Sequence, residues 1–418
     1  MRLLYVVPYT PSPIRVRPWE LARSLAAAGH DLTIATLYGG ATDRAWLRSL
    51  EDQGIGVLAR PLGRSRALSN CLRASWSGRP IQAEICWLPV LWRDIRQWIA
   101  ARPPDALWVE HLRGARYGEA LLEERARVGG KWPVVWDSVD CITLLFSQAR
   151  RLARSPRGRL MAAVDLARTR DYEGRWPARF DRVVVAAPGD RDALVELAGG
   201  AMPASHVAVV PNGVDLERFR TSPHPRPPGR LLFTGKLSYH ANDAAARFLL
   251  ESIMPRIWSE DPAAVLTLAG AEAGRQLRRA ASSQGARVRL TGWVEDLAPE
   301  FGAATLALAP LLYGVGVQNK VLEAMATATP VVATPVAAGA LDAVPGVEIL
   351  IAEGADEFAR QALELLRNPH LAAAVGYAGH DYVARHHRWH DSARACAGVL
   401  DQAREAAATL ASRRKAGA

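Results

Sequence analysis

Short apolar runs alternate with helical segments along this chain, and they do so in two separate series. The first run, Leu3–Val7, is followed by a proline-rich loop, by apolar residues at helical spacing from Trp19 to Ala26, and by a glycine turn. The next run, Asp31–Leu37, completes a strand–helix–strand unit. Because two parallel strands need a crossover helix between them, this pattern predicts a parallel sheet covered by helices.

The pattern continues to residue 210 and restarts after a proline-rich connector at 221–229. The first series adds strand candidates at 106–109, 134–136, 183–186 and 207–210, with an arginine-rich helical stretch at 142–180. The second series has apolar runs at 231–234, 265–269, 288–291, 306–309, 331–333 and 348–351, separated by predicted helices at 242–257, 271–284, 295–303, 318–327 and 355–367. We therefore predict an α/β fold with two doubly wound parallel sheets, in domains 1–205 and 206–388, followed by a helix over 389–418.

The composition is that of a globular protein, and we expect a cytoplasmic one. Of the 418 residues, 49% are hydrophobic and 22% are charged, and a chain of this length needs two or three domains. It has no apolar run long enough to span a membrane, and the apolar stretch at its start is too short for a secretory signal. The four cysteines show neither disulfide nor metal spacing, so reduced thiols are expected.

The net charge of +10 is concentrated in the first half of the chain. Residues 1–205 contain 30 arginines and lysines against 21 acidic residues, whereas residues 206–418 contain 22 against 21. A basic half suits an acidic acceptor, an anionic membrane surface or nucleic acid, while a scattered basic surface that only aids solubility is the plainer alternative. Because no aromatic and basic nucleic-acid motif is visible, we expect no nucleic-acid partner.

Lysine is rare in this chain, which makes each lysine informative. There are 48 arginines and four lysines, namely Lys131, Lys236, Lys320 and Lys415. An excess of arginine and alanine is typical of a GC-rich genome, so a lysine that persists against this background indicates a local requirement. Lys236 and Lys320 both lie in stretches that suit a phosphate.

The first of these stretches is Gly235-Lys236, which directly follows the predicted strand 231–234. Parallel α/β sheets bind ligands at the carboxyl ends of their strands. A glycine there lets the backbone approach a phosphate, and a lysine supplies a compact cation. We expect the next helix to begin near Asn242 and Asp243, whose side chains suit an N-cap. Taken alone, a surface lysine after a turn is the simpler interpretation.

The second stretch, Tyr313–Ala326, joins a glycine loop to a helix. Gly314 and Gly316 open the loop after the predicted strand 306–309. The helix is expected to start near Gln318, and the free N–H groups and dipole of its first turn favour a phosphate.

Lys320 and Glu323 lie three residues apart, so they share one face of this helix. The lysine can neutralise a phosphate, and the carboxylate can accept hydrogen bonds from ribose hydroxyls. An ordinary ion pair on a solvated helix is the alternative, but it does not explain the preceding glycines.

The first half of the chain offers fewer candidates. His111 follows a predicted strand and should lie at its carboxyl end, where a histidine is more often structural than functional. Asp137 and Asp140 follow another strand and either face an acceptor or cap a helix. Arg15 and Arg17 lie in the loop after the first strand, where arginine suits an acidic acceptor or a diphosphate.

Five segments resemble motifs of the family 4 glycosyltransferases, in that family's order and spacing. They are Val209–Phe219 (VVPNGVDLERF), Gly235-Lys236, Val288–Val294 (VRLTGWV), Lys320–Ala326 (KVLEAMA) and Thr329–Thr334 (TPVVAT). The first half of the chain resembles the family only in pattern. Within the family, the chain resembles in particular the sugar transferases of bacterial surface-polysaccharide clusters.

The resemblance implies a GT-B fold, in which two Rossmann-like domains face a cleft. It implies transfer of a sugar from a nucleotide-diphosphate sugar, with UDP as the expected nucleotide, with retention of anomeric configuration and without a metal or other cofactor. It places the diphosphate on Gly235, Lys236, Lys320 and the backbone of Gly314, Val315, Gly316 and Val317. It places the ribose on Glu323 and the base near Gly292, Trp293 and Val294.

Many family members have a histidine at the place of His111, where it touches the transferred sugar. The resemblance therefore makes Lys236, His111 and Glu323 the predicted catalytic residues. It also implies that the helix after Trp389 returns to the first domain.

The sequence departs from the family pattern at two positions. Val315 stands eight residues before Glu323, where the family commonly has a glutamate that contacts the donor sugar. Ala241 stands where a second basic residue commonly follows the Gly-Lys pair, and we interpret Lys320 as the replacement cation. The donor sugar therefore stays open, and an inactive or regulatory homologue is an alternative.

Two other functions fit parts of the pattern. A nucleotide-sugar epimerase or a sugar-phosphate synthase would use the same donor site, whereas a basic nucleic-acid-binding or regulatory protein would bind no nucleotide sugar. For a transferase we expect a lipid-linked glycan or a small molecule as acceptor. The basic first half would then favour peripheral contact with the inner face of the membrane.

Overall fold

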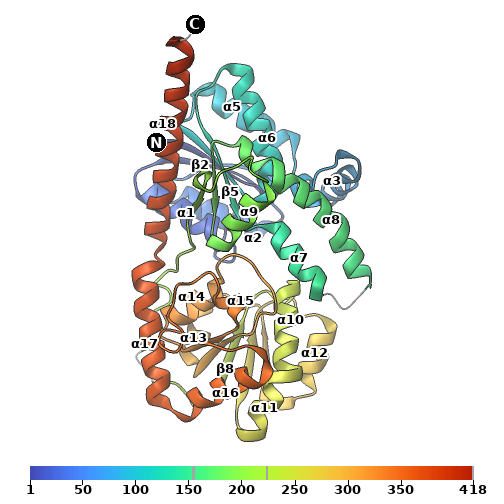
Figure 1. The fold of residues 1–418 in the computed structure, drawn as a ribbon, viewed down its shortest axis with the longest axis vertical. Coiled ribbons are helices and arrows are strands. Elements are labelled where there is room, and N and C mark those ends of the chain that lie inside the picture. Colours follow the sequence, from blue (N-terminus) through green and yellow to red (C-terminus); the bar gives the residue numbers. More distant parts are fainter. Residues whose placement is uncertain (153–155, 223–224, 417–418) are drawn as a thin grey trace. The chain divides into compact units, whose positions relative to one another are not determined.

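A computed structural model describes residues 1–152, 156–222 and 225–416, and it divides into two compact units that we describe separately. The first unit comprises Met1–Pro211 and Trp389–Ala418, and the second comprises Asn212–Arg388. Within the described residues each unit contains one parallel sheet covered by helices (Figure 1). The predicted α/β fold with two doubly wound sheets is therefore confirmed. Part of the expected connector (223–224) and the end of the tail (417–418) lie outside the described residues.

The first sheet has, in the part of the chain described, seven parallel strands in the order β3-β2-β1-β4-β5-β6-β7. Their bounds are β1 Arg2–Val7, β2 Asp31–Tyr38, β3 Gly56–Pro61, β4 Ala106–Glu110, β5 Val134–Val139, β6 Arg182–Val185 and β7 Val207–Val209. The central strands are apolar along most of their length because helices cover both faces of the sheet. β7 pairs with β6, so it belongs to the first unit although it lies beyond the boundary expected at residue 205.

β3 is not among the strands predicted from the sequence. It pairs with β2 at the edge of the sheet, and its six residues are half-buried or exposed. Such an edge strand needs no continuous apolar run, and Gly56 and Pro61 further weaken the strand pattern.

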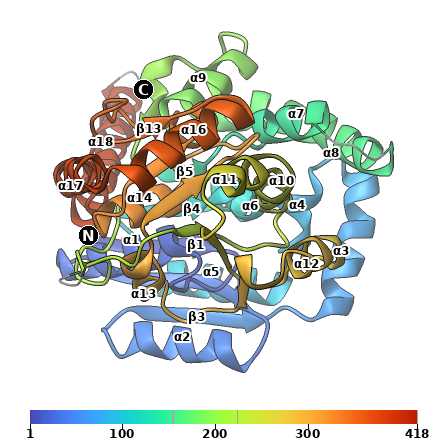
Figure 2. The ribbon, with the colours of Figure 1, turned by 90° about the horizontal axis from the view of Figure 1, so that it is seen from below.

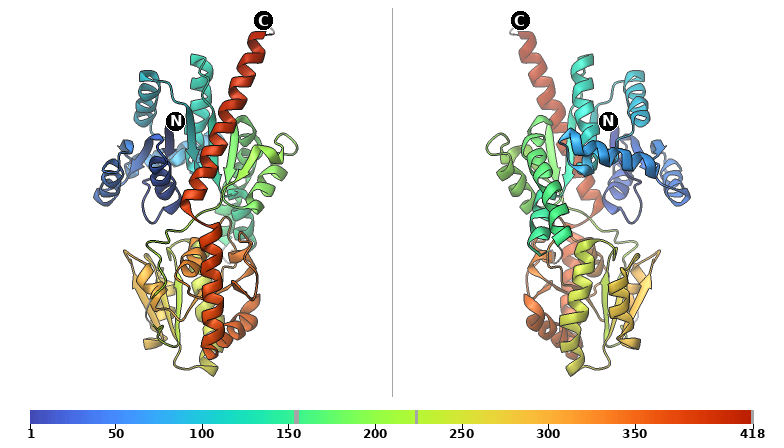
Figure 3. Two further views of the ribbon diagram at one scale, coloured as in Figure 1. Left: turned by 90° about the vertical axis from the view of Figure 1, so that its left-hand side faces the viewer. Right: turned by 90° about the vertical axis from the view of Figure 1, so that its right-hand side faces the viewer.

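The helices of the first unit come from both ends of the chain. They are α1 Val16–Ala27, α2 Ala41–Glu51, α3 Arg64–Ser77, α4 Ile81–Ile85, α5 Pro89–Ala101, α6 His111–Val128, α7 Ile142–Leu152, α8 Pro156–Arg175, α9 Pro188–Leu197 and α18 Trp389–Ala416. The C-terminal helix α18 runs beside α1 (Figure 3), and Trp389, Cys396 and Leu400 join Trp19 and Leu21 in one buried core. The last helix is therefore part of the hydrophobic core of the first unit.

The second sheet has, among the described residues, six parallel strands in the order β10-β9-β8-β11-β12-β13. Their bounds are β8 Arg230–Thr234, β9 Val265–Ala269, β10 Val288–Gly292, β11 Leu306–Ala309, β12 Val331–Ala333 and β13 Leu350–Ile351. The helices are α10 His240–Phe248, which continues through a π-helical turn at Leu249–Ile253, α11 Met254–Glu260, α12 Arg275–Ser282, α13 Ala298–Ala303, α14 Asn319–Ala326, α15 Pro335–Ala338, α16 Gly354–Arg367 and α17 Pro369–His386. α11 contacts α16, and α14 contacts both α13 and α17 (Figure 2). No helix of the described residues is long and apolar enough to cross a membrane.

Each sheet has a point where the strand order reverses. β1 lies between β2 and β4 in the first sheet, and β8 lies between β9 and β11 in the second. Loops that leave two such neighbouring strands diverge to opposite faces, and ligands of α/β proteins bind in the crevice between them. In the second unit the loops after β8 and β11, which carry the two lysine motifs, lie at this point of reversal.

Candidate functional site

The loop after β8 is shaped by a close approach of two backbone segments. Gly235 has φ 144°, and its N–H donates to Ala269 O at 3.0 Å. A Cβ atom on Gly270 would lie 1.9 Å from Gly235 O, so a side chain at Gly270 would displace the loop. The two glycines therefore bring the Gly-Lys loop against the end of β9 and leave Lys236 at the carboxyl edge of the sheet.

Lys236 is held by an exposed ion pair. Its Nζ lies 3.1 Å from Glu272 Oε2, and 56% of its side chain is exposed. Glu272 also accepts a hydrogen bond from Ser238 Oγ at 2.7 Å, and this bond together with Lys236 lowers the pKa of Glu272. Because exposed ion pairs contribute little to stability, Lys236 can exchange Glu272 for a phosphate at small cost.

Asn242 connects the Gly-Lys loop to α14. Its Nδ2 donates to Lys236 O at 3.0 Å, and Lys320 Nζ donates to its Oδ1 at 2.6 Å. The Lys320 ammonium also lies 4.6 Å from the centre of the Phe233 ring. The N-cap expected at Asn242 is wrong, because α10 already begins at His240 and Asn242 is buried within its first turn. Its side chain instead joins the two lysine motifs, which follow the neighbouring strands β8 and β11.

Lys320 and Glu323 are half-buried on α14, and their charges are poorly hydrated. Burial lowers the pKa of Lys320 to about 7, although Glu323 acts against the shift. Burial raises the pKa of Glu323 to about 7, while the positive charges of Arg218 and Lys320 act in the opposite direction. A phosphate beside Lys320 would favour the ammonium, and a hydroxyl that donates to Glu323 would favour the carboxylate. The pair therefore suits a ligand that carries both groups.

Glu323→Gln is expected to flatten the pH dependence of stability between about pH 4.5 and pH 7. The pKa of Glu323 is raised from 4.5 to about 7, so in this window the folded state binds more protons than the unfolded state. The wild type therefore loses stability as the pH rises through the window. Lys320, whose pKa is lowered to about 7, contributes only above that pH. Thermal unfolding across this range measures the slope, with the exposed Glu364→Gln as control. Equal slopes in the wild type and Glu323→Gln would contradict this account.

The glycine loop between β11 and α14 is closed by the residue that precedes the helix. Gln318 is the N-cap residue of α14, and its Nε2 donates to Val315 O at 3.0 Å. Gly316 has φ 64°, a left-handed conformation that glycine adopts without strain. The loop leads directly into the first turn of α14, where the helix dipole favours negative charge.

Neither of the two residues that depart from the family pattern carries a charge at this edge of the sheet. Val315 is half-buried, and its carbonyl is occupied by Gln318. Ala241 is only 3% exposed within α10. Lys320, which Asn242 links to the Gly-Lys loop, is therefore the candidate for the second cation.

The segment expected to hold a base lies farther along the same edge. Gly292 ends β10 with φ 70°, Trp293 is 57% exposed and Val294 is half-buried. In the sheet order β9 lies between β10 and β8, so this segment is separated from Lys236 by one strand. An exposed indole at this place can stack on a planar ring.

Two residues of the Val209–Phe219 segment support the site, and the sequence alone did not assign them these roles. Asn212 is buried, and its Nδ2 donates to Oδ1 of Asn319, the first residue of α14, at 3.0 Å. Arg218 is close enough for its charge to lower the pKa of Glu323. The sequence indicated only that both residues belong to a recognised motif. It could not show their contacts, because the partner residues lie about 100 residues away in the sequence.

In the first unit His111 begins α6 directly after β4. Its φ of 60° is unusual for a residue other than glycine, and such strain is found most often at functional sites. Its Nδ1 accepts a hydrogen bond from Arg113 N at 3.2 Å, and its ring meets the Tyr9 ring edge-on. Burial and the charge of Arg113 lower the pKa of His111 to about 3, so the imidazole is neutral at pH 7. It can bind a hydroxyl, but it brings no charge to a phosphate.

Arg17 and Asp137 form a buried ion pair. Arg17 Nη2 lies 2.9 Å from Asp137 Oδ2, and the two side chains are only 4% and 0% exposed. Arg17 also donates from Nη1 to Val210 O at 3.0 Å. Neither side chain is therefore open to a ligand, because both are enclosed in the first unit.

Arg15 and Asp140 remain accessible in the same unit. Arg15 is exposed, and its guanidinium lies 5.1 Å from the centre of the Tyr9 ring. Asp140 is half-buried, and burial together with the nearby Asp190 raises its pKa to about 8. Among the described residues, no group of three or more His, Cys, Asp or Glu side chains is placed to hold a metal ion.

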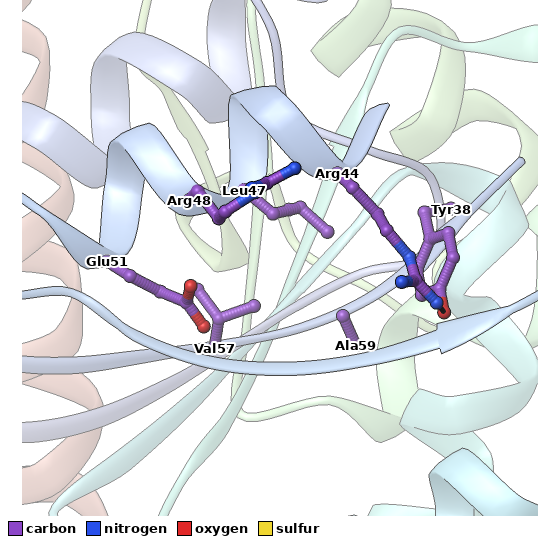
Figure 4. A pocket seen from close by; sticks show the side chains of 7 residues that line it. All are labelled: Tyr38, Arg44, Leu47, Arg48, Glu51, Val57 and Ala59. Atoms are coloured by element: carbon purple, nitrogen blue, oxygen red, sulfur yellow. Dashed lines mark hydrogen bonds between the residues drawn. The ribbon is translucent and has the colours of Figure 1, made fainter. Parts of the chain in front are cut away.

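A hollow of about 480 Å³ lies between α2 and the β3 edge of the first sheet (Figure 4). It is lined by Tyr38, Arg44, Leu47, Arg48, Glu51, Val57 and Ala59. The Arg44 guanidinium lies 4.7 Å from the centre of the Tyr38 ring, so one of its two arginines is already engaged. None of the predicted site residues lines this hollow, and we assign it no role.

Two family models match the chain in consecutive parts. Residues 16–218 match the model of Glycosyltransferase Family 4, and residues 228–368 match the model of Glycosyl transferases group 1. The chain belongs to these glycosyltransferases. Lys236, Lys320 and Glu323 all lie within the group 1 match, and His111 lies within the family 4 match. No curated protein matches this glycosyltransferase significantly.

Solved structures share the fold of this glycosyltransferase along nearly its whole length. HepE (Alr3699) from Anabaena, in complex with UDP and glucose, is 16% identical with a TM-score of 0.63, and the match covers 96% of this chain and 100% of that one. Sucrose-phosphate synthase from Thermosynechococcus elongatus is 18% identical with a TM-score of 0.67, covering 96% and 99%. A protein described as a UDP-N-acetylglucosamine 2-epimerase from Listeria monocytogenes is 14% identical with a TM-score of 0.54, covering 91% and 92%. The GT-B fold expected from the motifs is thereby confirmed.

Proposed function

We propose that this glycosyltransferase moves a sugar from a nucleotide-diphosphate sugar, with UDP as the first candidate, to an acceptor hydroxyl. The observation that carries the proposal is that Asn242 joins the two lysine motifs at the carboxyl ends of the neighbouring strands β8 and β11. Two cations beside a glycine loop and a helix N-terminus suit a diphosphate. Solved structures of the same fold, among them HepE with UDP and with UDP-glucose, support a uridine nucleotide.

In the proposed reaction the bond between the anomeric carbon of the donor and the diphosphate breaks, and a bond to the acceptor oxygen forms on the same face. The acceptor proton passes to the departing phosphate oxygen, and the nucleoside diphosphate leaves. Negative charge grows on that diphosphate, where Lys236, Lys320 and the N-terminus of α14 stabilise it. We propose that the reaction retains the anomeric configuration and needs no metal.

Two further residues at the same edge of the second sheet are assigned to the nucleoside. Glu323 would accept hydrogen bonds from the ribose, and Trp293 would stack on the base. In the first unit, His111 is proposed to bind a sugar hydroxyl as a neutral imidazole, since its lowered pKa keeps it uncharged. The acceptor is proposed to be a lipid-linked glycan or a small molecule.

UDP is expected to stabilise the protein more than UMP, in the presence and absence of EDTA. A ligand at 100 times its Kd adds about 2.7 kcal/mol to the free energy of unfolding, and UMP lacks the second phosphate that the two lysines would hold. A thermal-shift series with UDP, GDP, TDP and ADP, and then with their sugars, identifies the base and the sugar that the protein prefers. Equal shifts for UDP and UMP would refute the diphosphate site, and a shift that EDTA abolishes would refute metal independence.

Product analysis separates transfer from the rival reactions of the same fold. With a UDP-sugar alone, an epimerase would change the configuration of the sugar, whereas a transferase needs an acceptor. A sugar-phosphate synthase would use a sugar phosphate as that acceptor. A new glycoside formed on an unphosphorylated acceptor is the result that we expect.

A further inference from the structure

Helix α3 presents an apolar stripe to solvent. Leu68, Leu72 and Trp76 lie four residues apart, so they share one face of the helix. Their side chains are 64%, 62% and 90% exposed, in a unit whose other tryptophans are largely buried or half-buried. Contiguous exposed apolar side chains of this kind mark an interaction surface. We refer to these three residues as the α3 stripe.

The opposite face of α3 is fixed to the unit, so the stripe cannot turn inward. Asn70 is buried, and its Nδ2 donates to Ile85 O at 3.0 Å and to Trp87 O at 2.8 Å. Arg168 of α8 donates to the carbonyls of Ala74 and Ser75, at 3.1 and 3.2 Å, near the end of α3. Both helices appear side by side in Figure 1. The outward direction of the stripe is therefore set by polar contacts on the far side of the helix.

Positive charge flanks the stripe on both sides. Between Asp52 and Glu84 the sequence has no acidic residue and five arginines. At 100° per residue, Arg64 and Arg73 fall on either side of the stripe, and both are exposed. Among the described contacts, no ion pair involves either of these two arginines.

We propose that the α3 stripe docks this enzyme on an anionic lipid bilayer. Leucine and tryptophan side chains that project between flanking arginines match the boundary between acyl chains and anionic headgroups. A second copy of the chain is disfavoured as the occupant, because apposition of two stripes would bring the flanking arginines of one copy toward those of the other. The docking does not depend on the donor, so it goes beyond the proposed function and can be tested without turnover.

Co-sedimentation of the full chain with lipid vesicles tests this surface. We expect binding to vesicles of phosphatidylcholine mixed with phosphatidylglycerol, and little binding to phosphatidylcholine alone. Arg73→Ala should weaken binding about fivefold, because one basic residue near an anionic surface contributes roughly that factor. The double variant Leu72→Ser/Trp76→Ser should abolish binding, and raised salt should weaken the binding of the wild type.

Matched control variants on the second unit distinguish binding through the α3 stripe from non-specific binding to the vesicles. Tyr377 is 60% exposed on α17, so Tyr377→Ser should bind vesicles as the wild type does. Arg279→Ala on α12 is the corresponding control for charge. The thermal shift with UDP should stay unchanged in Leu72→Ser/Trp76→Ser, which shows that the variant is folded and that the donor site is intact.

Other outcomes would overturn the proposal. It fails if the wild type does not sediment with phosphatidylglycerol vesicles, or if the double variant binds them as strongly as the wild type. A wild-type dimer in solution that the double variant dissociates would assign the stripe to a second copy instead. None of these results bears on the donor site, which the UDP shift measures separately.

Discussion

Lys236→Ala is expected to lower kcat by about 10²–10³-fold while the protein stays folded, a loss typical of removing one preorganised group that stabilises developing charge. In the proposed reaction this charge appears on the leaving diphosphate. Lys236 reaches it from a loop that Gly235 and Gly270 hold against β9. Its ion pair with Glu272 is exposed, so its removal should hardly change the melting temperature.

Steady-state rates with the donor found in the thermal-shift series measure this effect. Lys131→Ala is the matched control, because Lys131 is also an exposed lysine but lies in a loop of the first unit. Lys236→Arg should retain part of the activity, since it keeps the charge but not the compact ammonium. A folded Lys236→Ala enzyme with near-normal turnover would refute the role assigned to this lysine.

Arg17→Met is expected to lower the free energy of unfolding by about 3–5 kcal/mol, the usual effect of leaving one charge of a buried pair without its partner. Asp137 would stay enclosed with no cation beside it, and the hydrogen bond to Val210 O would also be lost. Burial already raises the pKa of Asp137, and Arg17 acts against that shift. Without Arg17 the pKa rises further, so the loss of stability should be smaller at pH 5 than at pH 8.

Denaturant unfolding at the two pH values measures this effect. Arg23→Met is the control on the same helix, because Arg23 is 39% exposed and pairs with Glu20 at the surface. Such a pair contributes about 0–1 kcal/mol. A loss in Arg17→Met no larger than that in Arg23→Met would show that the buried pair is not needed for stability.

The apolar runs of the sequence were sufficient to predict the architecture. Strands buried on both faces, such as β1 and β4, are apolar along nearly their whole length and can be recognised without a structure. β3 was not predicted, because this edge strand is half-exposed and has no continuous apolar run. The π-helical turn at Leu249–Ile253 was also not predicted, because it lies inside the single helix expected over 242–257.

The sequence by itself determined the fold class, the family and the motifs that carry Lys236, Lys320 and Glu323, because each motif is local and its residue types suit a phosphate or a ribose wherever they occur. Only the tertiary structure decided which charges are available to a ligand. It enclosed Arg17 with Asp137, left Lys236 at the surface, and placed Asn242 between two motifs that are far apart in the sequence. The physical reason is that burial and partnership depend on contacts between distant residues, and these follow from the order in which the strands pair rather than from the pattern of any one segment.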